Sequence, residues 1–459
     1  MNKLNLNEHL SKLKSYTELR QHENRTMKIR IVGGLLVTNE KKVTSGISAR
    51  AYKNGYWGFA SNPVVNKNTI DEVIELATNN AEFLAAKGKM NLPNPKEEAQ
   101  ASYHDYSTKE KRLSQKQLIE FMYELDRLVE SLCPLLSSRA VTLSCTDMEK
   151  NLITSTGTTS YLNWPKTNIF IDMTINDSGE PCKLFQGFGG HGHFEDIFKS
   201  VDDFKKDIEL LYQELLKKNE GVVPQAGNHD VILDANLAGI LAHEALGHTV
   251  EADYVRVGTV AKNCFGEKVA SELISIVDFA HSYNGDLLPC PIHIDDEGVE
   301  AKDAWIIKDG YLTSYLHNRD SSKYFSMDNT GNARAWSFSD EPIIRMRNTC
   351  ILPGTSKLED MIASIDKGYY FTQTINGEAD FSGEFMFAVI SGYEIVNGKL
   401  GRAIKDTTIS GKAFEVLSSV TMVSDEMKWA PSGLCGKKQN IPVAMGGPAI
   451  KCKVNIGGQ

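Results

Sequence analysis

Two histidines five residues apart constrain the fold of this chain more than any other feature. His243 and His248 stand in the string HEALGH, with Glu244 directly after the first histidine. A regular α-helix turns about 100° per residue, so this spacing points the two side chains roughly 140° apart. If both imidazoles serve one site, the helix must hold about 4.4 residues per turn here, as in a π-helical turn. We therefore expect the helix over about residues 235–249 to be widened between the histidines, with Gly247 easing the distortion.

The residue types in this string suit a metal site. Neutral imidazole is a common zinc ligand, and a nearby Glu can act as general base on zinc-bound water. A third ligand is needed, and the chain offers Glu251 and Asp253 close by, or one of eight cysteines. Among these, Cys435 stands in a glycine-rich string beside Lys437, which favours a thiolate. The pattern alone does not decide which residue is the third ligand. It also allows the alternative that the segment is an ordinary amphipathic helix whose two histidines are structural and bind no metal.

Turn dipeptides predict that antiparallel strands make up much of the chain. Asn54-Gly55, Asp309-Gly310 and Asn397-Gly398 each separate strand-like segments, and such pairs favour tight hairpins. Further strand-like segments run from about residue 138 to 188, and the string HDVILD predicts a short strand.

Capping signals predict several helices between these strands. Thr69 with Glu72, and Ser114 with Gln117, each form a capping-box pattern before a long amphipathic segment. A third long helix is expected over DDFKKDIELLYQELLKK, and Asp234 is a plausible N-cap for the helix that carries HEALGH.

These elements predict an α+β chain of two domains. The stretch 217–227 combines charge, glycine and proline, as linkers do. We place the boundary there, between an N-terminal α+β domain over 1–222 and a C-terminal domain over 223–459. The second domain is predicted to be rich in antiparallel strands and to hold the HEALGH helix.

Composition limits the classes of partner. Lys and Arg number 50 against 59 Asp and Glu, a net charge of -9, which disfavours direct nucleic-acid binding. No apolar run is long enough for a transmembrane helix or a signal peptide. The eight cysteines are scattered without a CxxC pair, as expected in a reducing compartment, so we expect a soluble, cytoplasmic protein.

Two other groups of polar residues attract attention. His191 and His193 stand two apart in FGGHGHF and would face the same way on a strand, although a solvent-exposed glycine-rich loop is the favoured interpretation over a second metal site. Asp295, Asp296 and Glu297 form an acidic run, which we expect to be a solvated turn rather than a divalent-ion site.

Several long strings resemble the TldD/PmbA family of zinc metalloproteases, specifically its catalytic TldD-like branch. The resemblance is dense after residue 231 and begins near residue 27. The strings that carry it are TSGISARAYKNGYWGFAS (44–61), HEALGHTVEADYVRVGT (243–259), IHIDDEGV (292–299), TGNAR (330–334), RMRNT (345–349) and LCGKKQNIPVAMGGPAIK (434–451).

The resemblance implies a function and a set of site residues. It implies that His243, His248 and Cys435 bind Zn²⁺ and that Glu244 is the catalytic base. It implies hydrolysis of unfolded or small peptides, and pairing with a copy of the chain or with a homologous subunit. The alternative is a non-catalytic, protein-binding partner subunit, linked to regulation of DNA gyrase as the family has been.

Overall fold

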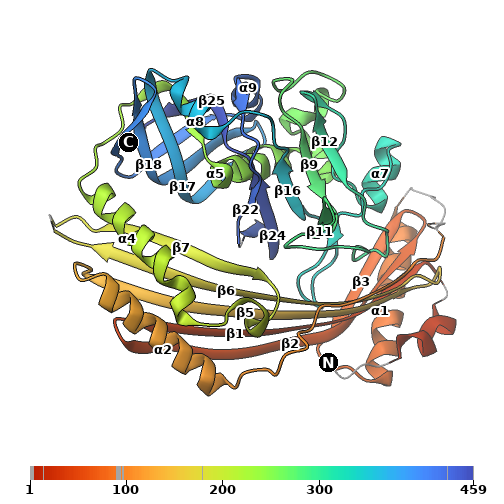
Figure 1. Cartoon of the computed structure of the whole chain (residues 1–459). Helices are drawn as coiled ribbons and strands as arrows, with labels where there is room; N and C mark the ends of the chain where they lie inside the picture. The colour runs from red at the N-terminus through yellow and green to blue at the C-terminus, as the bar shows by residue number, and fades with distance from the viewer. Residues whose placement is uncertain are drawn as a thin grey trace.

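The computed structural model describes residues 5–13, 15–88, 95, 98–177, 179–431 and 433–457. Its N-terminal half forms a long curved sheet, red to yellow-green in Figure 1, beneath a second layer built from the C-terminal half. The predicted α+β class, rich in antiparallel strands, is confirmed. The predicted boundary at 222/223 falls between a long helix and the next strand, and it stays a prediction.

The N-terminal sheet has seven strands in the order β3-β2-β1-β5-β6-β4, with β7 beside β6. All neighbours are antiparallel except β4 and β6. The strands are β1 (Thr17–Val32), β2 (Leu35–Lys53), β3 (Tyr56–Asn62), β4 (Ala101–Asp105), β5 (Ser138–Thr154), β6 (Thr159–Ile175) and β7 (Cys182–His191).

The two faces of this sheet are covered differently. Along β1, Leu19, Ile29 and Ile31 pack in clusters with the helices, whereas Glu18 and Arg20 point to the opposite face. Successive side chains of a strand alternate between the two faces of the sheet. The odd-numbered residues named here therefore contact the helices, and the even-numbered ones contact the C-terminal half.

Three long helices cover the first face. They are α1 (Lys67–Lys87), α2 (Gln115–Leu132) and α4 (Lys205–Asn219), with the short α3 (Phe194–Ile197) and 3₁₀ turns at Leu6–Lys12 and Val201–Phe204. The capping box of Ser114 and Gln117 is confirmed. The predicted box of Thr69 with Glu72 is wrong: Asn66 is the N-cap and Thr69 is its partner at the third position. An Asn caps as well as a Thr does, so the helix begins three residues earlier than the Thr69–Glu72 pattern predicts.

The C-terminal half contains two more seven-stranded sheets. One has the order β13-β12-β9-β16-β24-β22, with β23 beside β24, and the other has the order β17-β8-β25-β20-β18-β19, with β21 beside β25. Because β17 also pairs with β18, five strands of the last sheet close into a ring. The three hairpins expected at Asn54-Gly55, Asp309-Gly310 and Asn397-Gly398 are confirmed.

The bounds of these strands and of the remaining elements complete the fold. The strands are β8 (Gly227–Leu233), β9 (Ile276–Phe279), β10 (Ser282–Tyr283), β11 (Asp286–Leu287), β12 (Ala304–Lys308), β13 (Tyr311–Leu312), β14 (Ala333–Arg334), β15 (Ile343–Ile344), β16 (Asn348–Ile351), β17 (Lys367–Ala379), β18 (Glu384–Val396), β19 (Lys399–Ala403), β20 (Thr407–Lys412), β21 (Met422–Val423), β22 (Lys428–Trp429), β23 (Gly433–Lys437), β24 (Gln439–Gly447) and β25 (Ile450–Ile456). The helices are α5 (Ala235–Ile240), α6 (Ala252–Val257), α7 (Arg319–Phe325), α8 (Leu358–Ala363) and α9 (Ala413–Ser418), with a 3₁₀ turn at Val260–Asn263.

The helix that carries HEALGH lies in the main core of the C-terminal half. Leu237, Leu241, Ala245 and Leu246 are fully buried among strands of both C-terminal sheets. As predicted, α5 begins at Ala235 after Asp234, although the Asp234 carboxylate makes no capping hydrogen bond. Within the described ranges, no helix is long and apolar enough to cross a membrane.

The acidic run Asp295, Asp296 and Glu297 is buried, so the predicted solvated turn is wrong. Lys150 Nζ lies 2.7 Å from Asp296 Oδ2, and Arg50 Nη1 lies 2.5 Å from Glu297 Oε1. Burial opposes ionisation of Asp296, yet Lys150 and Arg20 hold its pKa below the usual range. The partners come from β1, β2 and β5, more than 140 residues away, so these carboxylates bind the C-terminal half to the N-terminal sheet.

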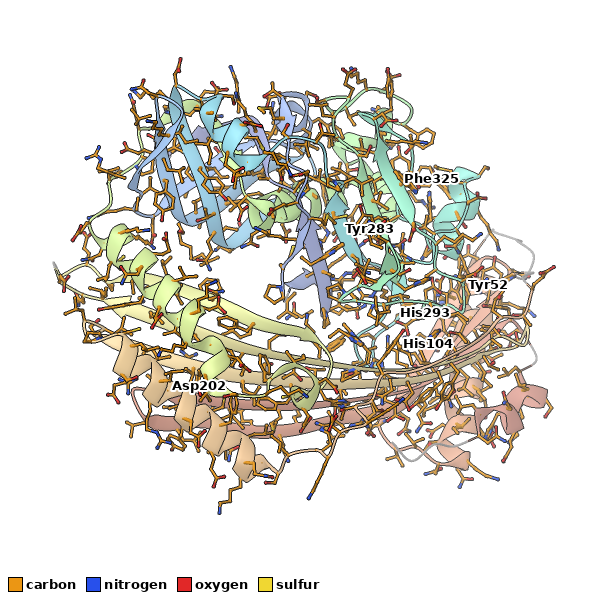
Figure 2. The ribbon with its side chains drawn as sticks, viewed as in Figure 1. Tyr52, His104, Asp202, Tyr283, His293 and Phe325 are labelled. Atoms are coloured by element: carbon orange, nitrogen blue, oxygen red, sulfur yellow. The ribbon has the colours of Figure 1, made fainter. Side chains whose placement is uncertain are left out.

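A stack of imidazoles lies at the same junction. His104 of β4 stacks on His293 with ring centroids 3.5 Å apart, and His281 stacks on the other side at 4.4 Å. Figure 2 labels His104 and His293 where the curved sheet meets the upper layer. The contact between the two halves therefore combines ion pairs with stacked rings.

Candidate metal centre

The helix widens between the two histidines, as predicted. After α5 the chain makes a π-helical turn over Leu241–Leu246 and then a 3₁₀ turn over Gly247–Val250. The wider turn carries His248 back toward His243, and the two ring centroids are 5.4 Å apart. One backbone irregularity thus lets a spacing of five residues serve one site.

Gly247 has a different role from the one expected. Its φ of -53° and ψ of -46° are ordinary helical angles, which any residue adopts. A Cβ at this position would lie 2.0 Å from Met346 Sδ and 3.0 Å from Met346 Cε. The missing side chain makes room for a buried methionine rather than relieving the backbone.

A β-hairpin brings Cys435 to the histidines from 187 residues further along the chain. β23 pairs with β24 in antiparallel register around Lys438, whose φ is 59°. Along β23 the side chains alternate, so Leu434 is exposed while Cys435 is buried. Cys435 Sγ lies 3.3 Å from His248 Nε2, and one donor atom from each of His243, His248 and Cys435 lies within 4.8 Å of the others.

The two carboxylates that rivalled Cys435 in the sequence lie elsewhere around the site. Glu251 Oε2 is 2.9 Å from His248 Nδ1, the ring nitrogen that does not face Cys435. Asp253 accepts a hydrogen bond from Lys437 Nζ at 2.8 Å. Across the described ranges, His243, His248 and Cys435 form the one group of three such donors close enough to hold a metal ion.

The charges of this group favour a metal-binding state. Burial alone would raise the pKa of the Cys435 thiol, but the adjacent His243 and His248 imidazoles outweigh it and lower this pKa to about 4. Burial likewise disfavours protonated His248, but Glu251 and the Cys435 thiolate raise the pKa of His248 well above its usual value. Both shifts reflect the negative charge that Glu251 and the Cys435 thiolate place around the His248 ring. A bound divalent cation would balance that charge in place of the ring proton.

The donor set fits a zinc ion. Both ring nitrogens of His243 are buried and have no hydrogen-bond partner among the described residues. A buried, unsatisfied imidazole is costly unless another group binds it. Two imidazoles and a thiolate are ligands that zinc prefers, and three protein ligands leave one position open.

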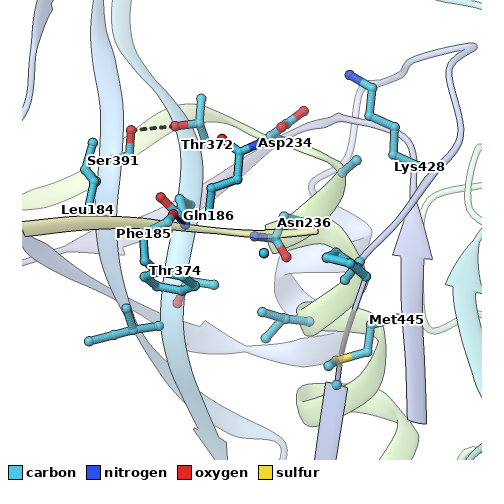
Figure 3. Close-up of a pocket in the computed structure, with 18 of the residues that line it drawn as sticks. Leu184, Phe185, Gln186, Asp234, Asn236, Thr372, Thr374, Ser391, Lys428 and Met445 are labelled. Carbon is cyan, nitrogen blue, oxygen red and sulfur yellow. Dashed lines mark hydrogen bonds between the residues drawn. The ribbon is translucent and has the colours of Figure 1, made fainter. Parts of the chain in front are cut away.

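Glu244 borders both this donor group and a large cleft. Its Oε1 lies 4.0 Å from His243 Nε2 and its Oε2 lies 3.7 Å from His248 Nε2. The cleft measures about 940 Å³ and runs between the N-terminal sheet and the C-terminal half. Figure 3 shows residues that line it from both halves of the chain, among them Phe185 and Gln186 of β7, Asn236 of α5, and Thr372 and Thr374 of β17.

His191 and His193 do not lie in a solvent-exposed loop, so that expectation is wrong. His193 is buried beside α3, with Nε2 3.3 Å from Asp147 and Nδ1 accepting a hydrogen bond from the backbone of Thr108. His191 ends β7, and its ring meets Tyr106 edge-on. Neither histidine belongs to a group of three metal donors among the described residues.

One residue that holds the site had no predicted role, although it opens the RMRNT string that contributes to the family resemblance. Arg345 is fully buried and donates to the carbonyl oxygens of Cys435 at 2.5 Å and Gln439 at 2.7 Å. It thereby fixes the hairpin that carries the thiol. Arginine is rarely buried without partners, and its partners lie 90 residues away or more, so nothing near Arg345 in sequence reveals this contact.

Comparison with known proteins identifies the family. Residues 226–458 match the PmbA/TldA metallopeptidase C-terminal domain, and residues 17–81 match the PmbA/TldA metallopeptidase domain 1. The first match alone spans more than half of the chain, so the chain belongs to the TldD/PmbA family, and the resemblance seen in the sequence is confirmed.

Relatives of the chain are named as metalloproteases. The chain is 35% identical over 310 residues to the metalloprotease TldD homolog of Buchnera aphidicola from Acyrthosiphon pisum, covering 64% of this chain and 62% of that protein. It is 27% identical over 442 residues to the zinc metalloprotease TldD homolog of Saccharolobus solfataricus, covering 93% and 94%. The crystal structure of TldE from Thermococcus kodakarensis has a TM-score of 0.75 over 99% of both chains at 19% identity, which shows a common fold.

Proposed function

We propose that this chain is a zinc-dependent peptidase that hydrolyses peptide bonds of unfolded or small peptide substrates. One arrangement carries the proposal: two imidazoles and a thiolate converge within 4.8 Å, and the Glu244 carboxylate lies between them and a large cleft. The names of the curated relatives support the same chemistry.

In this proposal His243, His248 and Cys435 hold the zinc ion, and Glu244 moves the protons. Bound zinc supplies Lewis-acid polarisation of a peptide carbonyl and a lowered pKa for a water molecule. The Glu244 carboxylate takes a proton from the attacking water and passes it to the nitrogen of the leaving amine. Its place beside both Nε2 atoms, at the wall of the cleft, suits both transfers.

The cleft supports a short peptide segment as the substrate. Pockets for small ligands measure about 300–1,000 Å³, and a volume of about 940 Å³ holds a few residues but not a folded domain. The walls mix apolar side chains, such as Phe185, Ile375 and Leu434, with uncharged polar ones, such as Thr372 and Asn376. The lining also includes three carboxylates, Glu214, Asp234 and Glu244, and one lysine, Lys428, so acidic groups outnumber basic ones along the cleft.

We also propose that the protein pairs with a copy of itself or with a homologous subunit, and that it acts in the cytoplasm. Membership of the TldD/PmbA family and the shared fold with TldE support the pairing. All eight cysteines are free, which suits a reducing compartment.

The second candidate is a non-catalytic partner subunit that binds protein and regulates it. Such a subunit needs no metal donors and no general base, whereas this chain holds three donors and Glu244 together. Metal analysis separates the two: the peptidase is expected to hold about one zinc ion per chain, and a binding subunit none.

The test is cleavage of an unstructured peptide library by the purified protein, before and after removal of zinc with a chelator. Glu244→Gln is nearly isosteric but cannot take up a proton, so we expect it to keep zinc and to lose ~10²–10⁴ in rate. Glu214→Gln is the matched control, because Glu214 also lines the cleft but bonds to Tyr393 and Lys217. A Glu244→Gln variant with a tenth of the parent rate would remove Glu244 from the role of base.

A further inference from the structure

One buried ion pair joins the two parts of the chain that carry the metal donors. We propose that Glu251 and Lys437 are positioning residues of the metal centre, which couple the orientation of His248 to the position of the strand that carries Cys435. The inference rests on the proposed zinc site and extends it to residues outside the donor group.

Glu251 orients His248 from the side away from the other donors. The Glu251 side chain is fully buried, and its Oε2 lies 2.9 Å from His248 Nδ1. Nε2 of the same ring faces Cys435 Sγ at 3.3 Å. A hydrogen bond from Nδ1 to the carboxylate places the proton on Nδ1 and leaves the lone pair of Nε2 directed at the donor group.

Lys437 holds that same carboxylate oxygen. Its ammonium group is buried and lies 3.2 Å from Glu251 Oε2. It also donates to Asp253 at 2.8 Å and to the backbone carbonyl of Ile344 at 3.2 Å, and it lies 4.0 Å above the Tyr254 ring. The two buried contacts, to the Glu251 carboxylate and to the Ile344 carbonyl, remain when Asp253 is replaced, and they fix the lysine and, through it, the glutamate.

The position of Lys437 on β23 turns this ion pair into a link between two elements. Lys437 follows Cys435 by two residues, so both side chains leave the strand on the same buried face. The thiolate meets Nε2 of His248, while the ammonium meets the carboxylate bonded to Nδ1 of the same ring. A shift of the hairpin therefore moves Cys435 together with Lys437, whose ammonium group holds the carboxylate that orients His248.

Asp253 provides an internal control for this inference. Its side chain is 42% exposed and it binds Lys437, but the structure shows it in no contact with His248. Exposed ion pairs contribute little, whereas breaking a contact to the fully buried Glu251 leaves a buried charge unpaired. Loss of Asp253 should leave the metal centre nearly unchanged.

The experiment measures zinc affinity by competition with a chelator, in the absence of peptide. We expect Glu251→Met to weaken zinc binding about 10–100-fold, and Glu251→Gln, which keeps an acceptor for Nδ1, to recover most of it. Asp253→Leu should change zinc affinity less than about threefold. Lys437→Met should weaken binding in the parent but add little to Glu251→Met, because the partner is already absent.

Cobalt substitution gives a second readout that a purely structural role would not change. In Lys437→Met we expect a weaker thiolate-to-cobalt absorption band, since the strand that carries Cys435 is released. Equal zinc affinity in Glu251→Met and the parent, or strictly additive effects of Glu251→Met and Lys437→Met, would overturn the inference. The double variant removes both buried charges, so it tests the link even if Glu251→Met folds poorly. A parent protein that binds no zinc would instead overturn the proposed function.

Discussion

Gly247→Ala distinguishes two explanations for the glycine beside the second histidine. If the glycine is needed for backbone freedom, alanine is harmful in any context. If it is needed for space, the harm comes from Met346 and disappears when Met346 is shortened. The helical φ of -53° favours space.

The magnitudes follow from the geometry. The new Cβ would lie 2.0 Å from Met346 Sδ, where carbon contacts are comfortable at about 3.5–4.0 Å. Met346 is fully buried, so it escapes only by straining its neighbours, and overpacking of this kind costs about 1–3 kcal/mol. In a Met346→Ala background that clash is gone, and the remaining close neighbour of the new Cβ is the Ala242 carbonyl oxygen at 3.3 Å, which has to shift by only a few tenths of an ångström. Gly→Ala at helical angles should then stabilise by at most about 0.4–1 kcal/mol.

The assay is thermal unfolding of the parent, both single variants and the double variant at one heating rate. We expect Gly247→Ala to lower the apparent Tm of the parent and to raise that of Met346→Ala. The reversal of sign is the decisive feature. An equal loss in both backgrounds would refute the steric explanation and restore the requirement for backbone freedom.

Two further predictions concern the thiol and the junction between the halves. Cys435→Ser should lose most of the bound zinc and the peptidase activity, whereas Cys452→Ser, at another buried thiol, should keep zinc; retention of zinc by Cys435→Ser would remove Cys435 as a ligand. Burial and the neighbouring His104 and His281 lower the pKa of His293 to about 4, below the ~6.5 of an unfolded histidine. The stability that neutral His293 contributes is therefore lost as the pH falls from about 6.5 to about 4. His293→Phe keeps a flat ring in the stack and should flatten the fall of apparent Tm in that window; a profile parallel to that of the parent would contradict this assignment.

Local signals predicted those parts of the fold that depend on local chemistry. Asn54-Gly55 formed its hairpin because both residues adopt the positive φ that such a turn requires. The widening of the helix followed from the spacing of His243 and His248, since no regular helix brings them together. In each case the information lies within a few residues.

Features that depend on distant partners were missed. In the sequence, the run from Asp295 to Glu297 resembles a solvated turn. In the fold it is buried, because Arg50 and Lys150 of the N-terminal sheet pair with Glu297 and Asp296. Cys435 shares no local pattern with His248. Its glycine-rich string beside Lys437 made it a candidate, but only the resemblance to a family chose it over Glu251 and Asp253 as the third ligand. Burial of a charge and convergence of ligands are properties of the assembled fold, which spacing along the chain does not encode.

The most direct test of the central claim is X-ray absorption at the zinc edge of the purified, zinc-loaded protein. If His243, His248 and Cys435 hold the metal, the spectrum fits one sulfur at about 2.3 Å and two imidazole nitrogens at about 2.0–2.1 Å, with one further light ligand. The sulfur should vanish in Cys435→Ser and persist in Cys452→Ser. A shell of nitrogen and oxygen alone in the parent protein would contradict the account and return the third position to a carboxylate.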